Sequence, residues 1–151
     1  MFTYRKRLFD ALLEEALEAK GAVVVRGPKW CGKTTTAEQA AKSVIYLDDP
    51  ETAEQNLLMA QTRPSRLLVG EAPRLIDEWQ DAPQLWDAIR YDIDHSHALG
   101  KFILTGSAVP PDDKKRKLVK HTGTGRFAWL TMRPMTLFES GESSGGVSLG
   151  D

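Results

Sequence analysis

The residue types most suited to chemistry in this sequence occur together in one stretch. That stretch reads Gly27-Pro28-Lys29-Trp30-Cys31-Gly32-Lys33-Thr34. Its spacing fits the pattern G-x-x-x-x-G-K-[ST], in which glycines let successive backbone N–H groups point toward an anion. The lysine and the hydroxyl that end the pattern supply a cation and a metal ligand. The stretch therefore predicts a loop that binds the phosphates of a nucleotide.

Three residues at the end of this loop have specific expected roles. Lys33 would reach the β- and γ-phosphates, and the Thr34 hydroxyl would ligate Mg²⁺. Thr35 would contact the α-phosphate. The helix expected to follow adds the partial positive charge of its amino terminus. A glycine-rich turn with a chance lysine is the weaker interpretation, because a β-branched run precedes the loop and a helical segment follows it.

Two adjacent carboxylates supply what a phosphate loop lacks for hydrolysis. Asp77 and Glu78 follow Leu75 and Ile76 at the carboxyl end of an expected strand, where α/β sheets bind ligands. Asp77 would hold Mg²⁺ through water, opposite Thr34, and Glu78 would orient or deprotonate the attacking water. Such a pair can also cap a helix. Downstream of a phosphate loop, the catalytic interpretation is favoured.

Two further residues are candidates for the same site. The hydroxyl of Thr105, at the end of an expected strand, would help to hold the catalytic water if that strand lies between those of the phosphate loop and the acidic pair. A strand-ending turn is the alternative. Arg126 would stabilise the transition state if it lies near the γ-phosphate. It could equally be a surface arginine.

Short β-branched runs alternate with amphipathic segments along the chain. The expected strands are residues 22–26, 43–47, 74–78, 101–105 and 126–131. The expected helices are residues 7–19, 35–42 and 49–61, and one that opens at Pro83. Asp49 is the expected cap of the helix at 49–61. The helix at 7–19 has one apolar face, made of Leu8, Phe9, Leu12, Leu13, Ala16 and Leu17. Strands alternating with helices imply an α/β fold, a parallel sheet with helices on both faces in three αβα layers.

Length and composition fit one soluble domain. The chain has 151 residues, 41% of them hydrophobic, and a net charge of −1, which allows a buried core and gives no global attraction to nucleic acid. No run is long and apolar enough to span a membrane, and a single cysteine suits a reducing cytoplasm. We expect a core over residues 1–139 and a flexible Gly/Ser-rich end over residues 140–151.

One basic cluster bears on partners. Lys114–Lys117, with Lys120 and His121, would suit contact with a nucleic-acid backbone. A solvated loop or helix face is the commoner reason for such a run, and the neighbouring Asp112 and Asp113 weaken the nucleic-acid case. Contact with a neighbouring subunit's nucleotide is a further alternative.

The histidines and tryptophans are expected to have ordinary roles. His95 and His97 have no companion ligands nearby in the sequence, so surface positions are favoured over a metal site. Trp79, Trp86 and Trp129 are expected to be packing residues.

Several motifs of this chain occur together in one known family. They are Gly27–Thr34, Leu75–Gln80, Leu104–Ser107, Gly125–Arg126 and Arg133–Glu139. In combination they resemble the AAA-14 ATPases, in the AAA+-like branch of the P-loop proteins, over residues 4–149. The phosphate loop and the Asp-Glu pair are common to the superfamily. The Asp-Glu-Trp-Gln, Leu-Thr-Gly-Ser and Arg-Pro-Met-Thr-Leu-Phe-Glu stretches are the specific ones.

The resemblance implies a P-loop NTPase fold with a five-stranded parallel sheet in the order 5-1-4-3-2. It implies that ATP and Mg²⁺ are the ligands, with Lys33 on phosphate and Thr34 on magnesium. Asp77 corresponds to the metal-orienting acid and Glu78 to the catalytic base.

Two other expectations come from the same resemblance. Thr105 corresponds to the polar sensor residue, and Arg126 to an arginine finger or sensor acting within its own chain or, in a homo-oligomer, on a neighbour. Members of the family usually continue into a C-terminal DUF4143 domain. The resemblance therefore predicts that this chain is the nucleotide-binding core of a longer protein.

Three functions are compatible with these motifs. The first is an ATPase core in which water attacks the γ-phosphate in line and hydrolysis drives conformational change or assembly. The second is a non-hydrolysing ATP-dependent switch, which the presence of both Asp77 and Glu78 argues against. The third is a small-molecule or nucleotide kinase, in which an Asp-Glu pair is less typical. The guanine-binding pattern Asn-Lys-x-Asp is absent from the sequence, which disfavours a GTPase.

Overall fold

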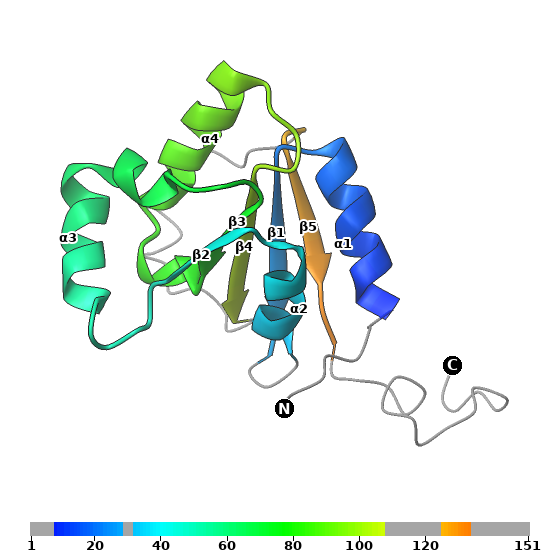
Figure 1. Cartoon of the computed structure of the whole chain (residues 1–151), viewed down its shortest axis with the longest axis horizontal. Helices are drawn as coiled ribbons and strands as arrows, with labels where there is room; N and C mark the ends of the chain where they lie inside the picture. The colour runs from blue at the N-terminus through cyan, green and yellow to red at the C-terminus, as the bar shows by residue number, and fades with distance from the viewer. Residues whose placement is uncertain (1–7, 29–31, 108–124, 134–151) are drawn as a thin grey trace, which may run out of the picture.

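A computed structural model describes residues 8–28, 32–107 and 125–133. Strands and helices alternate along these residues (Figure 1). The strands are β1 Ala22–Gly27, β2 Ser43–Tyr46, β3 Arg74–Asp77, β4 Phe102–Ser107 and β5 Phe127–Thr131. The helices are α1 Leu8–Ala19, α2 Lys33–Ala40, α3 Ala53–Thr62 and α4 Leu85–Ser96, with the short 3-10 turns η1 Pro64–Leu68 and η2 Trp79–Asp81.

The strands form one parallel sheet in the order β2-β3-β4-β1-β5. Read from the other edge, this is the predicted order 5-1-4-3-2, which is confirmed. β4 lies between β1 and β3, so Thr105 pairs with Val25 on one side and with Asp77 on the other. Because the carboxyl ends of parallel strands meet at one edge, the insertion of β4 assembles residues that are far apart in the sequence.

One face of the sheet packs against α1 and α2. Its buried residues are Phe9, Leu13, Val23, Val25, Ala37, Leu75, Ile103 and Met132. The prediction of a wide apolar face on α1 is only partly correct, because Leu8 and Leu12 are 63% and 53% exposed. The buried stripe of α1 is therefore narrower than the apolar spacing indicates.

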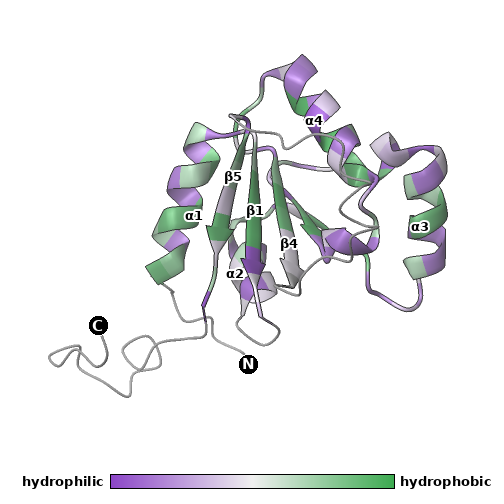
Figure 2. Cartoon of the chain, turned by 180° about the vertical axis from the view of Figure 1, so that it is seen from behind, coloured by the Kyte–Doolittle hydropathy of each residue, from purple (hydrophilic) through white to green (hydrophobic). Residues whose placement is uncertain are grey.

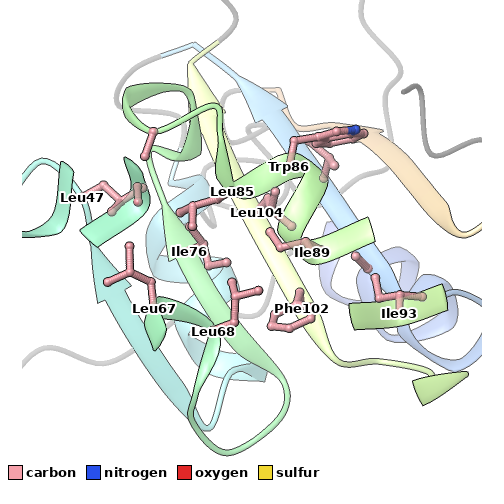
Figure 3. Close-up of a cluster of buried hydrophobic side chains, with 14 of the residues drawn as sticks. Leu47, Leu67, Leu68, Ile76, Leu85, Trp86, Ile89, Ile93, Phe102 and Leu104 are labelled. Carbon is pink, nitrogen blue, oxygen red and sulfur yellow. The ribbon is translucent and has the colours of Figure 1, made fainter. Parts of the chain in front are cut away.

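The opposite face packs against α4, with α3 and η1 beside it (Figure 3). Its largest buried residues are Leu47, Ile76, Leu85, Trp86, Ile89, Phe102 and Leu104. Val24 faces this layer whereas Val23 and Val25 face the other. The run Ala22–Val25 is apolar without alternation because β1 is central and covered on both faces, and Figure 2 shows it as the hydrophobic part of that strand.

The start of α3 corrects one prediction. Asp49 was expected to cap a helix with Pro50 in its first turn, but α3 begins at Ala53, after Thr52. The Asp49 carboxylate instead accepts a hydrogen bond from the Glu51 N–H at 3.0 Å, and its carbonyl accepts one from the Ala53 N–H at 2.8 Å. These contacts are those of a cap on the turn at residues 50–52, so Asp49 caps the turn that precedes α3 rather than α3 itself.

The start of α4 differs from its prediction by two residues. Pro83 was expected to open this helix, which begins at Leu85. The carbonyl of Pro83 accepts a hydrogen bond from the Trp86 N–H at 3.1 Å, so a turn at Pro83 leads directly into the helix. The apolar face of α4, which includes Trp86 and Ile89, is buried against the sheet.

Candidate active site

The predicted phosphate loop begins where β1 ends, at the carboxyl edge of the sheet. Gly27 is buried and aligned with Ser107 of β4. Gly32 has a φ of +89°, a left-handed conformation that favours glycine. The Gly32 carbonyl accepts a hydrogen bond from the Thr36 N–H at 2.9 Å, so this glycine turns the chain into α2. Residues 29–31, which include predicted Lys29, Trp30 and Cys31, lie outside the described residues.

The helix after the loop begins two residues earlier than the sequence predicts. It starts at Lys33 rather than Thr35 and ends at Ala40 rather than Lys42. Lys33 and Thr34 are therefore in its first turn, where backbone N–H groups have no partner within the helix and a partial positive charge gathers. The Lys33 side chain is only 6% exposed and crosses this end of the helix toward β3. These features suit an anion at the amino end of α2.

Asp77 joins the phosphate loop to the middle of the sheet. Its carboxylate oxygen Oδ1 accepts hydrogen bonds from the Thr34 hydroxyl at 2.7 Å and from the Thr105 hydroxyl at 2.6 Å. Asp77 is 5% exposed and Thr105 is fully buried. The contact to Thr105 follows from the sheet, since residues paired in register on adjacent parallel strands place their side chains side by side.

Glu78 differs from the prediction that it would extend β3. The strand ends at Asp77, and Glu78 adopts a left-handed conformation with a φ of +58°. Strand alternation would have pointed its side chain to the α4 face, away from α2. The left-handed turn instead brings its Oε1 to 4.0 Å from the Nζ of Lys33. Such backbone conformations in residues other than glycine are uncommon and occur often at functional sites.

The electrostatic environment of Glu78 favours its protonated form more than water does. Burial raises the pKa of the Glu78 carboxyl, and the hydrogen bond from Gln80 and the charge of Lys33 lower it by less, so the net direction is upward. A raised pKa brings a carboxylate closer to the range that suits a general base. The arrangement thus fits a group that accepts a proton from water.

The donor set at Thr34 and Asp77 fits magnesium. A hydroxyl and a carboxylate oxygen, 2.7 Å apart, are hard oxygen ligands of the kind that Mg²⁺ takes from protein beside phosphate oxygens and water. No group of three or more His, Cys, Asp or Glu side chains gathers in the part of the chain that the structure describes.

Replacing Thr105 with valine tests the contact between β4 and Asp77. Valine keeps the shape but removes the hydroxyl that donates to Asp77, a hydrogen bond to a charged group worth about 1.5–3 kcal/mol. We expect the free energy of unfolding, measured with urea, to fall by about that amount. Thr131→Val, at an exposed position of β5, is the matched control. An unchanged midpoint for Thr105→Val would contradict the contact.

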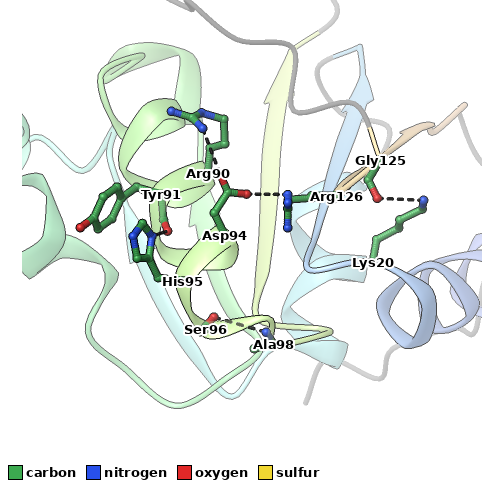
Figure 4. A network of polar contacts seen from close by, with 9 residues as sticks. All are labelled: Lys20, Arg90, Tyr91, Asp94, His95, Ser96, Ala98, Gly125 and Arg126. Carbon is green, nitrogen blue, oxygen red and sulfur yellow. Dashed lines mark hydrogen bonds and ion pairs between the residues drawn. The ribbon is translucent and has the colours of Figure 1, made fainter.

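Arg126 is not brought to this site, which corrects its predicted role near its own γ-phosphate. Its carbonyl accepts a hydrogen bond from the Gly21 N–H at 3.1 Å, so it lies beside the amino end of β1. The length of β1 separates that end from the phosphate loop by about 17 Å, given a rise near 3.3 Å per residue. The guanidinium Nε lies 2.5 Å from Oδ1 of Asp94, which also pairs with Arg90 at 3.0 Å (Figure 4).

The remaining candidate residues lie outside this site. His95 and His97 are exposed at the end of α4, as predicted. Trp86 is buried and Trp79 packs against it, whereas Trp129 is 42% exposed, so its packing role is only partial. The basic cluster at 114–121 and the segment 140–151 lie outside the described residues. No helix in the described part of the chain has the length and apolar character to span a membrane.

One residue at the site received no role from the sequence. The side-chain amide of Gln80 donates a hydrogen bond to Oε2 of Glu78. The sequence signal for Gln80 was its place at the end of the Asp-Glu-Trp-Gln stretch. In a strand that continues, Glu78 and Gln80 would lie on one face about 7 Å apart. The left-handed turn at Glu78 is what brings their side chains into contact.

The comparisons with known proteins agree with this geometry. The family model described as an AAA domain, AAA-14, matches residues 19–140. No curated protein matches the chain. The matched span contains the phosphate loop, the Asp-Glu pair and all five strands described above. The chain belongs to the AAA-14 family of AAA domains and carries a nucleotide-binding module of that kind.

Proposed function

We propose that this chain binds ATP with Mg²⁺ and hydrolyses it to ADP and phosphate. The observation that carries the proposal is the convergence of Lys33, Thr34 and Glu78 around the buried Asp77 at the carboxyl edge of the sheet. A phosphate loop alone would support binding. A carboxylate with a raised pKa, 4.0 Å from the loop lysine, supports chemistry on the terminal phosphate.

Each residue has a distinct task in this proposal. The amino end of α2, with Lys33, binds the phosphates, and Asp77 and Thr34 hold the metal between them. Mg²⁺, when bound, supplies positive charge to the β- and γ-phosphate oxygens. Glu78 accepts the proton of the attacking water. Thr105, through Asp77, keeps the metal-orienting carboxylate in place.

Binding of ATP would also change the surroundings of Glu78. Lys33 ends the phosphate loop and lies 4.0 Å from Glu78, so a triphosphate would compete for its positive charge. When Lys33 turns to phosphate, the hydrogen bond from Gln80 remains on the Glu78 carboxylate.

A contribution from Arg126 to hydrolysis would require a second copy of the chain. Arg126 lies at the amino edge of its own sheet, away from its own phosphate loop. The proposal also includes a homo-oligomer, and it includes the coupling of hydrolysis to conformational change or to a C-terminal DUF4143 domain. These parts rest on the family resemblance alone.

Replacing Lys33 with alanine tests the phosphate site. Loss of the charge at the amino end of α2 is expected to weaken Mg-ATP binding at least about tenfold and to abolish turnover. Calorimetric titration gives the affinity, and phosphate release gives the rate. Lys42→Ala removes an exposed lysine just beyond the same helix and should behave as wild type.

The results separate the three candidate functions. ATP binding and hydrolysis by Lys33→Ala at wild-type levels would contradict the assignment of the phosphate site. Tight ATP binding by the wild type without phosphate release would favour an ATP-dependent switch. ATP consumption only in the presence of a phosphate acceptor would favour a kinase.

A further inference from the structure

The Glu78 carboxylate has two partners of different character. One oxygen lies 4.0 Å from the ammonium of Lys33, and the other accepts a hydrogen bond from the side-chain amide of Gln80. The donor must be the amide nitrogen, because an ionised carboxylate only accepts. The contact with Lys33 competes with phosphate, whereas the contact with Gln80 does not.

The backbone around Gln80 is held by hydrogen bonds. Gln80 lies in the middle of η2, where the Glu78 carbonyl accepts from the Asp81 N–H and the Trp79 carbonyl accepts from the Ala82 N–H, both at 3.0 Å. The ring of Trp79 packs against buried Trp86, with their centroids 5.3 Å apart. The backbone that carries Gln80 is therefore fixed relative to β4 and Trp86.

The side-chain oxygen of Gln80 faces β4 at Gly106. A Cβ on Gly106 would lie 2.6 Å from that oxygen and 3.2 Å from the Nε1 of Trp79. The Gln80 oxygen is buried, and no described residue donates a hydrogen bond to it. A side chain at position 106 would therefore push the amide away from its present place.

We propose that Gln80 is a positioning residue, which keeps the Glu78 carboxylate aimed at the attacking water after Lys33 turns to the phosphates, and that Gly106 provides the room it needs. This inference rests on the proposed function of Glu78 as proton acceptor. The inference explains two residues by one contact, because the glutamine of Asp-Glu-Trp-Gln and the glycine of Leu-Thr-Gly-Ser meet between η2 and β4.

Replacing Gln80 with methionine tests the hydrogen bond, because methionine keeps the length and loses the amide donor. The carboxylate would then no longer be held toward the attacking water, whereas Lys33 and α2 are untouched, so kcat should fall and the affinity for Mg-ATP should stay at the wild-type value. A fall in kcat of about tenfold is expected where a hydrogen bond to a charged group is lost. Gln61→Met, at an exposed position of α3, is the matched control.

A comparison of rate with affinity accompanies the melting temperature. Gln80→Met should lower kcat and leave the affinity for Mg-ATP, measured by calorimetry, unchanged. A merely structural role for Gln80 would lower the melting temperature without lowering kcat at temperatures where the variant is folded.

Gly106→Ala provides an independent variant. It should lower kcat more in the wild-type background than in the Gln80→Ala background, where only the contact with Trp79 remains. Equal effects of Gly106→Ala in both backgrounds would show that the glycine acts without Gln80 and would overturn that part of the proposal.

The two proposals fail in different ways. If Glu78→Gln abolishes hydrolysis while Gln80→Met keeps the wild-type kcat, the positioning role alone is wrong. If Glu78→Gln hydrolyses ATP as the wild type does, the catalytic role of Glu78, on which this inference rests, is wrong.

Discussion

Glu78→Gln is expected to reduce ATP hydrolysis by about 10²–10⁴-fold, the usual contribution of a positioned general base. Glutamine has nearly the same shape but cannot take the proton of the attacking water. ATP affinity should change little, because Lys33 and the amino end of α2 are untouched. Phosphate release and calorimetric ATP binding, measured on the same preparation, give both quantities.

Glu54→Gln is the matched control, at an exposed position of α3. It should leave hydrolysis and binding at wild-type values. Hydrolysis by Glu78→Gln within a few-fold of wild type would remove Glu78 from the mechanism. Loss of ATP binding together with hydrolysis would indicate that the carboxylate supports the phosphate site rather than the chemistry.

The same variant should alter the pH dependence of stability. Burial raises the pKa of Glu78 in the folded chain above its unfolded value, so the folded state binds this proton more tightly. The contribution of Glu78 to the free energy of unfolding is therefore fully present at low pH and is lost as pH rises through the folded pKa. The difference in melting temperature between Glu78→Gln and the wild type should therefore shift in favour of the variant as pH rises. In acid no such shift is expected.

Trp86→Ala is expected to destabilise the fold by about 3–5 kcal/mol, as large aromatic-to-alanine changes in cores do. Trp86 is fully buried in the core (Figure 3). It stacks on Phe127 with ring centroids 4.3 Å apart, and it also contacts Trp79 and Trp129. Since whole domains have about 5–15 kcal/mol of stability, this loss is a large fraction of the total. Urea unfolding followed by circular dichroism measures it.

Trp129→Ala is the comparison within the same aromatic cluster. Trp129 is 42% exposed on edge strand β5, so less apolar area is lost and the destabilisation should be clearly smaller. Equal midpoints for the two variants would contradict the central place of Trp86. Because Trp79 packs on Trp86 and follows Glu78 in the chain, Trp86→Ala should also lower hydrolysis in molecules that remain folded.

The chemistry of the phosphate loop is readable without a fold, because it resides in contiguous residues. Gly27 to Thr34 carries its own glycines, cation and hydroxyl, and an apolar run precedes it. The Asp-Glu pair is readable for the same reason. The strand order was also predictable, but from the family resemblance, since periodicity alone does not order strands.

The contacts among distant residues required the tertiary arrangement. Thr105 meets Asp77 because β4 is inserted beside β3 in one particular register. Arg126 looks like a catalytic arginine in the sequence, yet the parallel direction of β5 puts it at the amino edge. The place of Arg126 at the start of an expected parallel strand already indicated that edge, since ligands bind at the carboxyl ends of such strands.

Glu78 marks the boundary between these two kinds of information. Its residue type and its place after Asp77 predict an acid at the phosphate site, and the sequence alone is enough for that prediction. Its left-handed backbone, its approach to Lys33 and its bond to Gln80 depend on how β3 ends and how η2 packs against β4. Residue types specify which groups are available, whereas the packing of strands and turns decides which of them meet.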